Sequence, residues 1–104
     1  KPSQLLIVYD DFVFKLGMIR IRPMGSAAGH NGMESVIERV SSKEISRLRI
    51  GISQGQPPLD YSAYVLEDFE EREGEILEEV LERSSRAVNT ILSDGLERAM
   101  ALYN

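Results

Sequence analysis

An unbroken run of large apolar side chains at residues 5–9 (LLIVY) constrains the fold of this chain most strongly. The run is too short for a helix and consists of residues that favour strands. A continuous apolar strand is typical of the centre of a sheet that is covered on both faces. We therefore expect a buried central strand here, which ends at the carboxylates of Asp10 and Asp11.

Two further segments alternate apolar and charged side chains, as strands with one buried face do. They span residues 18–22 (MIRIR) and residues 47–52 (RLRIGI), and Pro23 ends the first of them. The side chains that this alternation turns outward are Arg20, Arg22, Arg47 and Arg49. The pattern thus predicts two half-buried strands that present faces of arginine.

Helical spacing of apolar side chains appears in two places. The first stretch comes directly after a loop of small residues at 25–32 (GSAAGHNG). The second spans residues 76–92, where the opposite face is rich in glutamate. Asp94, with Glu97 three residues later, predicts a capping box that opens a last helix.

Strands that alternate with helices predict an α/β fold. A strand covered on both faces needs helices on both sides of its sheet, so we expect a three-layer sandwich with a mixed, mostly parallel sheet. A loop at residues 54–62 and a short strand at residues 64–66 complete the expected elements. Because the chain begins directly on its most apolar strand, we expect residues 1–104 to be the C-terminal portion of a single larger domain.

The charges are distributed unevenly along the chain. The net charge of −5 combines +3 on residues 1–50 with −8 on residues 51–104. A basic first half can face a phosphate backbone, whereas an acidic helix can face solvent. With no cysteine and one histidine, we predict no disulfide and no metal site. The absence of cysteine fits a reducing compartment, so we expect a cytoplasmic protein. No apolar run approaches the roughly 18 residues of a membrane span, so we expect no membrane partner.

Asp10 is the first candidate functional residue, because ligands of open α/β sheets bind at the carboxyl ends of the strands. A carboxylate there can orient a histidine that acts as a general base, or it can cap a turn. His30 is the only histidine, and it can pair with Asp10 or be structural. Asn31 can cap the following helix, with or without an anion bound at the same helix start.

Arg22 and Arg49 lie on neighbouring predicted strands and can together clamp a phosphate, since guanidinium groups suit bidentate contact. The alternative is that both are solvated surface arginines. The loop GSAAGHNG is not a phosphate-binding P-loop, because it lacks the lysine and hydroxyl side chain that hold a triphosphate and its magnesium ion. Nucleotide hydrolysis is therefore not predicted.

Four segments, taken together, point to a known family. They are LLIVYDD, KLGMIRIRPMGSAAGHNGMES, RLRIGIS and the stretch from YVLEDF to DGLERAMALYN. In these segments the chain resembles the bacterial-type peptidyl-tRNA hydrolases over its whole length. Members of this family cleave the ester that joins a peptide to the 3′ end of tRNA, and they need no cofactor.

The resemblance implies a role for each candidate residue. Asp10 corresponds to the carboxylate that orients the catalytic histidine. Asn31 corresponds to an asparagine that holds the substrate through its carboxamide, and His30 to a histidine that lines the cleft. Arg22 and Arg49 correspond to the basic residues that grip a terminal phosphate of tRNA.

The catalytic histidine of the family lies in an N-terminal segment for which this sequence has no counterpart, since His30 matches a second histidine of the family. The resemblance therefore implies a monomeric hydrolase of peptidyl-tRNA, of which these 104 residues are inactive on their own. Two alternatives stay open. One is a non-catalytic RNA-binding module of the same fold, and the other is an assembly domain whose acidic helix binds a partner.

Overall fold

The computed structural model describes residues 4–27, 29–53 and 71–104. The expected loop at residues 54–62 and the expected strand at residues 64–66 lie outside the described residues. The described elements are β1 (Leu6–Lys15), β2 (Ile19–Arg22), α1 (Asn31–Val40), β3 (Ser46–Ser53), α3 (Glu71–Asp94) and α4 (Leu96–Tyr103).

The three strands form one mixed sheet in the order β1-β3-β2. β3 pairs in parallel with β1 and antiparallel with β2. The predicted α/β class and the mixed sheet are confirmed, with one parallel and one antiparallel pairing among the described strands. Because β2 follows β1 directly in sequence but pairs on the other side of β3, the chain must cross β3 between these two strands.

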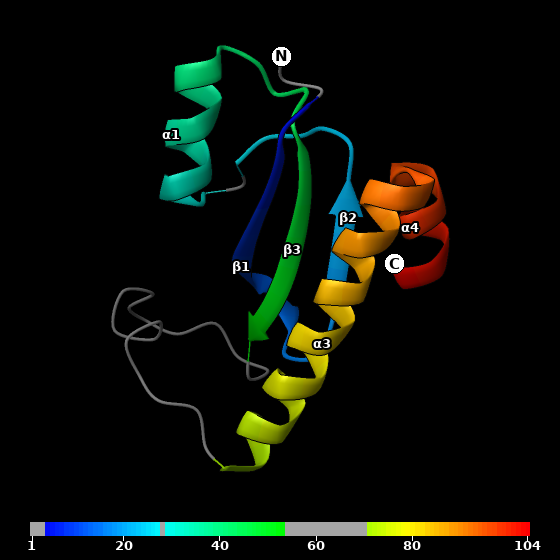
Figure 1. The fold of residues 1–104 in the computed structure, drawn as a ribbon. Helices are drawn as coiled ribbons and strands as arrows, with labels where there is room; N and C mark the ends of the chain where they lie inside the picture. Colours follow the sequence, from blue (N-terminus) through cyan, green and yellow to red (C-terminus); the bar gives the residue numbers. More distant parts are fainter. Residues whose placement is uncertain (1–3, 28, 54–70) are drawn as a thin grey trace.

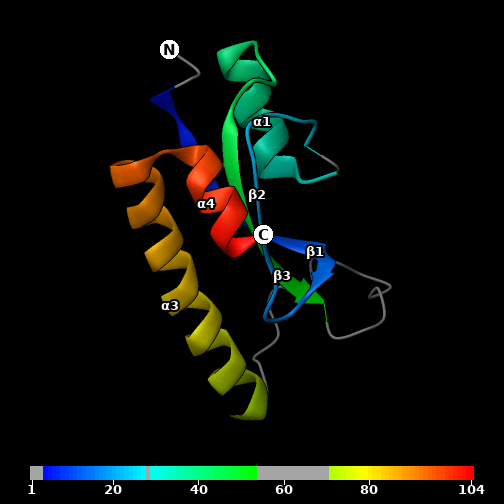
Figure 2. The same ribbon diagram turned by 90° about the vertical axis from the view of Figure 1, so that its right-hand side faces the viewer.

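Helices cover both faces of the sheet (Figures 1 and 2). α3 and α4 pack on one face, where they bury Ile19, Ile21, Leu48 and Ile50 of the strands. α1 packs on the other face through Met33, which lies in a second cluster with Tyr9 and Ile45. Each cluster joins strand residues to helix residues that are distant in sequence, so the three layers hold together through two separate cores.

β1 differs from the expected central strand in two ways. It lies at the edge of the described sheet, and the side chain of Val8 is 47% exposed there. It also continues to Lys15 instead of ending at Asp10. Between Asp11 and Lys15 the pairing of β1 with β3 shifts register, and in this stretch the Asp11 carboxylate accepts the backbone N–H of Val13. The buried central strand is β3.

Arg47 was expected to point to solvent, and this prediction is wrong. Its side chain lies on the face that α1 covers, and the residue is only 2% exposed. Its guanidinium group donates hydrogen bonds to the backbone carbonyl oxygens of Ile45, Ser26 and Lys43, at 3.1, 2.7 and 3.1 Å. Three carbonyl acceptors compensate for the burial of the charge, so Arg47 ties the loop before α1 to the sheet.

The long amphipathic helix predicted over residues 76–92 is confirmed as part of α3. The predicted capping box is wrong, because Gly95 is the N-cap of α4 and no side chain caps this helix. Gly95 has a φ of 98°, a conformation that glycine adopts without strain, and it reverses the chain between the two helices. None of the helices in the described ranges is both long and apolar enough to cross a membrane.

Asn104 fastens α4 to β2. Its Oδ1 accepts the N–H of Ile21 at 2.7 Å, and its Nδ2 donates to the carbonyl oxygen of the same residue at 3.0 Å. The side-chain amide thus takes the place of a neighbouring strand at this residue, which satisfies backbone groups that an edge strand otherwise leaves open.

Candidate active site

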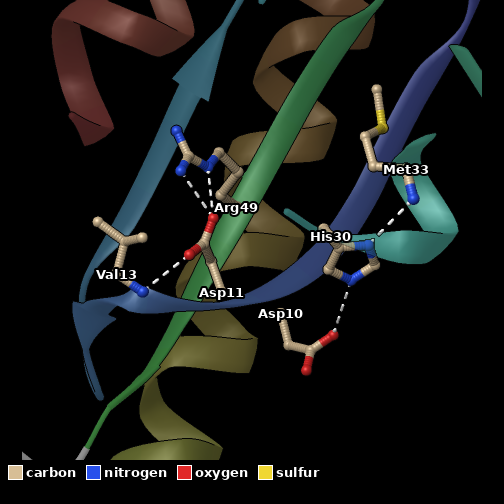
Figure 3. Close-up of polar contacts among 6 residues, drawn as sticks. All are labelled: Asp10, Asp11, Val13, His30, Met33 and Arg49. Carbon is tan, nitrogen blue, oxygen red and sulfur yellow. Dashed lines mark hydrogen bonds and ion pairs between the residues drawn. The ribbon is translucent and has the colours of Figure 1, made fainter. Parts of the chain in front are cut away.

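Asp10 lies on β1 beside the N-terminus of α1. Its side chain is 48% exposed, and Oδ1 lies 3.5 Å from Nε2 of His30 (Figure 3). The second oxygen, Oδ2, makes no hydrogen bond or ion pair within the ranges that the structure describes. The structure therefore brings together the carboxylate and the histidine that the sequence singled out, and it leaves half of the carboxylate open to a further partner.

His30 connects β1 to α1 through both nitrogens of its ring. It is the N-cap of α1, and its Nδ1 accepts the backbone N–H of Met33 at 3.0 Å. The neutral ring therefore carries its proton on Nε2, which faces Asp10. The ring also packs on Tyr9, with 4.7 Å between the ring centroids.

This arrangement decides what His30 can do chemically. A general base needs a nitrogen with a free lone pair that points at the proton it removes. In His30, Nδ1 is occupied by the helix N-terminus and Nε2 holds the proton. His30 is thus arranged to hold the Asp10 carboxylate and the start of α1 in place, and it is not arranged to activate a water molecule.

Asn31 is the first residue of α1, so the expectation that it caps this helix is wrong. The imidazole of the preceding residue, His30, takes that role because its Nδ1 reaches the Met33 N–H. Asn31 is exposed, and within the described ranges its carboxamide makes no hydrogen bond. The carboxamide is therefore free to bind a ligand next to the Asp10–His30 pair.

Asp11 is a part of the site that the sequence placed only at the end of the expected first strand. It is buried, with 8% of its surface exposed. Its Oδ1 accepts the N–H of Val13 at 2.8 Å, and its Oδ2 accepts from Nε of Arg49 at 2.8 Å and from Nη2 at 2.7 Å (Figure 3). The signal that sequence reasoning lacked is the register, because Arg49 lies opposite Tyr9, two residues before Asp11.

Arg22 and Arg49 point to the same face of the sheet but are not direct neighbours. Arg22 is opposite Arg47, whereas Arg49 is opposite Arg20. Arg22 is exposed, and its Nη1 donates only to the carbonyl oxygen of Ile21 within the described chain, at 3.2 Å. Within the described residues Arg22 therefore has no carboxylate partner, whereas Arg49 is paired with a buried carboxylate.

The described residues contain no group of three or more His, Cys, Asp or Glu side chains that could hold a metal ion. What they do contain is an exposed carboxylate, a free carboxamide and a row of arginines. A carboxylate of this kind can orient an imidazole, a carboxamide can bind a peptide-like group, and arginines can bind phosphates.

Three comparisons with known proteins agree on one family. A family model described as peptidyl-tRNA hydrolase matches residues 1–104. A Gloeobacter violaceus protein named peptidyl-tRNA hydrolase is 48% identical over 103 residues, and a Thermotoga petrophila protein of the same name is 44% identical over 103 residues. Each match covers 99% of this chain, and 52% and 55% of the two relatives.

The fold is also shared with a solved structure. The crystal structure of peptidyl-tRNA hydrolase from Acinetobacter baumannii superposes with a TM-score of 0.86 at 24% identity, over 99% of this chain and 54% of that one. This level of identity shows the fold alone. The chain spans about half the length of the relatives and of the solved structure that it matches.

Proposed function

Because the chain belongs to the peptidyl-tRNA hydrolase family, we propose that it contributes the carboxylate and the substrate contacts of an enzyme that cleaves the ester between a peptide and tRNA. In this proposal the 104 residues form the C-terminal portion of one larger catalytic domain. The length of the chain, about half that of the relatives, supports the proposal.

The observation that carries the proposal is the Asp10–His30 pair. Among the residues that the structure describes, one carboxylate oxygen of Asp10 has no partner, while both nitrogens of His30 are engaged. The open oxygen can accept a hydrogen bond from the N–H of a second imidazole. The other nitrogen of that imidazole then takes a proton from a water molecule, which attacks the ester carbonyl. Since the only histidine of this chain is not arranged as a base, that imidazole comes from outside these 104 residues.

The substrate contacts follow from the same geometry. Asn31 binds the peptide end of the substrate through its carboxamide, and His30 forms the adjacent wall of the cleft. Arg22 and Arg49 bind phosphate groups of the tRNA from the arginine face of the sheet. Water-mediated ester cleavage needs a base and polarisation of the carbonyl, so the proposal includes no cofactor and no metal. The proposed enzyme is a monomer that works in the cytoplasm.

A chimaeric protein tests this function. The chain replaces the segment that it matches in the Gloeobacter violaceus relative, at 48% identity. We expect the chimaera to cleave peptidyl-tRNA with a kcat/KM within about tenfold of the intact relative, because the rest of the relative supplies the base and the chain supplies its partner carboxylate. Cleavage is measured as the release of labelled peptide from tRNA.

The alternative of a non-catalytic RNA-binding module predicts a different result. In that case the folded chimaera binds tRNA but releases no peptide, although the relative's own catalytic segment is present. A chimaera whose circular dichroism spectrum matches that of the relative, and which binds tRNA without cleavage, would therefore refute the hydrolase proposal.

A further inference from the structure

The imidazole of His30 makes two polar contacts that fix its orientation. Its Nδ1 accepts the N–H of Met33 at 3.0 Å, and its Nε2 lies 3.5 Å from Oδ1 of Asp10 (Figure 3). A half-turn of the ring would place carbon atoms where the two nitrogens now lie, so both contacts form in one orientation of the ring. The link between α1 and the Asp10 carboxylate therefore depends on the groups that keep this ring from turning.

Tyr9 of β1 packs against the imidazole of His30. The centroids of the two rings are 4.7 Å apart, and the ring planes are tilted by 56°. Tyr9 is itself buried, in one cluster with Met33 and Ile45. Because side chains in a packed core keep their rotamers, Tyr9 is a rigid wall that restricts the rotation of the neighbouring imidazole.

Gly32 lies against the same ring from the backbone of α1. A Cβ at this residue would lie 3.1 Å from Cε1 and 3.4 Å from Nδ1 of His30. The shorter distance is tighter than an ordinary contact, so a side chain here would push the imidazole away by a few tenths of an ångström. The absence of a side chain at Gly32 thus leaves room for the ring in the orientation that reaches Asp10.

We propose that Tyr9 and Gly32 are positioning residues for the proposed reaction, because they hold the imidazole of His30 in one orientation. Within the described ranges this imidazole is the polar partner of the Asp10 side chain, so its orientation sets the direction of the second carboxylate oxygen. That oxygen is the one that receives the external base. The inference therefore rests on the proposed function, and it adds to it two residues that act through His30.

The substitution Gly32→Ala in the chimaera should lower activity without lowering stability. Alanine costs less backbone entropy than glycine in a helix, so the melting temperature should equal that of the parent chimaera or exceed it. The displaced imidazole should lower kcat about tenfold, since a misplacement of about 1 Å can cost about 100-fold. Gly74→Ala is the matched control, because a Cβ there meets nothing within 4 Å on α3, and it should keep the parent kcat.

Two substitutions at Tyr9 separate its ring from its hydroxyl group. Tyr9→Phe keeps the ring that contacts His30, so kcat should stay within about twofold of the parent. Tyr9→Leu keeps an apolar side chain in the cluster but removes the ring, and it should lower kcat about tenfold while KM changes less than about threefold. Circular dichroism and thermal unfolding set an assay temperature at which every variant is folded.

A double-mutant cycle shows whether Gly32 acts through the imidazole. In His30→Asn the new side-chain oxygen can still cap α1, but there is no ring to orient. His30→Asn alone should lower kcat about tenfold, and adding Gly32→Ala should lower it by less than about twofold more. A further tenfold loss in the His30→Asn background would show that Gly32 acts by another route and would overturn the proposal.

The ¹⁵N NMR signals of the imidazole in the 104-residue chain separate this inference from the proposed function. His30 is the only histidine, so its ring gives one set of signals. At alkaline pH, where the ring is neutral, we expect the proton on Nε2 in the wild type and a mixture of both tautomers in Gly32→Ala and Tyr9→Leu.

The two failures are then distinguishable. If the parent chimaera does not cleave peptidyl-tRNA but the tautomers change as expected, the proposed function fails, while the hold of Tyr9 and Gly32 on the ring stands. If the parent chimaera cleaves its substrate and both Gly32→Ala and Tyr9→Leu keep kcat within about twofold, the inference is refuted while the proposed function stands. Tautomers that are unchanged in both variants refute the inference as well.

Discussion

The substitution Asp10→Asn is expected to lower kcat for peptidyl-tRNA cleavage by the chimaera about 10³- to 10⁴-fold, as loss of the carboxylate that orients a general-base histidine does in hydrolases. An amide can still contact His30, but it cannot stabilise the imidazolium that forms when the base takes a proton. The measurement is single-turnover release of peptide, with the enzyme in excess over substrate.

Stability should hardly change in this variant. The Asp10 side chain is 48% exposed and its contact with His30 is long, at 3.5 Å, so the pair contributes less than about 1 kcal/mol to folding. Glu38→Gln provides a control with the same chemical change on the exposed side of α1 and should retain wild-type activity. An Asp10→Asn chimaera that keeps kcat within twofold of the parent would refute the assignment of Asp10.

The substitution Gly51→Ala is expected to lower the free energy of unfolding by about 3 kcal/mol or more, the upper part of the range for overpacking. Gly51 lies where β1 passes close to β3. A Cβ at this position would collide with the carbonyl oxygen of Lys15 and lie 2.8 Å from the carbonyl carbon and oxygen of Phe14. These are backbone atoms, which cannot rotate away as the end of a side chain can.

Gly74→Ala is the matched control, and it should change stability in the opposite direction. A Cβ at Gly74 meets nothing within 4 Å, and the residue lies within α3. Alanine there should raise the free energy of unfolding by about 0.5 to 1 kcal/mol, because glycine costs more backbone entropy in a helix. Urea unfolding of both variants checks the pair. A Gly51→Ala variant as stable as the wild type would mean that β1 does not pass β3 in this way.

The sequence predicted those parts of the fold that depend on local patterns. Alternation of apolar and charged residues located β2 and most of β3, and helical spacing located α1 and α3. The apolar run located β1 as a strand but does not show which strands lie beside it, and β1 lies at the edge of the described sheet. The burial of Arg47 was missed because period-two alternation does not show that the segments before and after α1 bring the carbonyl oxygens of Ser26 and Lys43 onto this side chain.

The candidate site was predictable in its residues but not in its contacts. Pairing of His30 with Asp10 was one of two alternatives that the sequence left open, and in the structure Nε2 of His30 lies 3.5 Å from Oδ1 of Asp10. The ion pair of Asp11 with Arg49, and the contact of Phe14 with both Arg49 and Arg20, depend on strand register. A register is set by long-range pairing, which a single sequence without related sequences does not reveal.

The measurement that tests the central claim most directly is the rate at which the unmodified 104-residue chain releases peptide from peptidyl-tRNA, with the protein in large excess and His30→Ala measured beside it. We predict that both proteins give the rate of the reaction without protein, because neither nitrogen of His30 is available to take a proton from water. Peptide release well above that rate by the chain, abolished in His30→Ala, would contradict the account and make His30 the catalytic base.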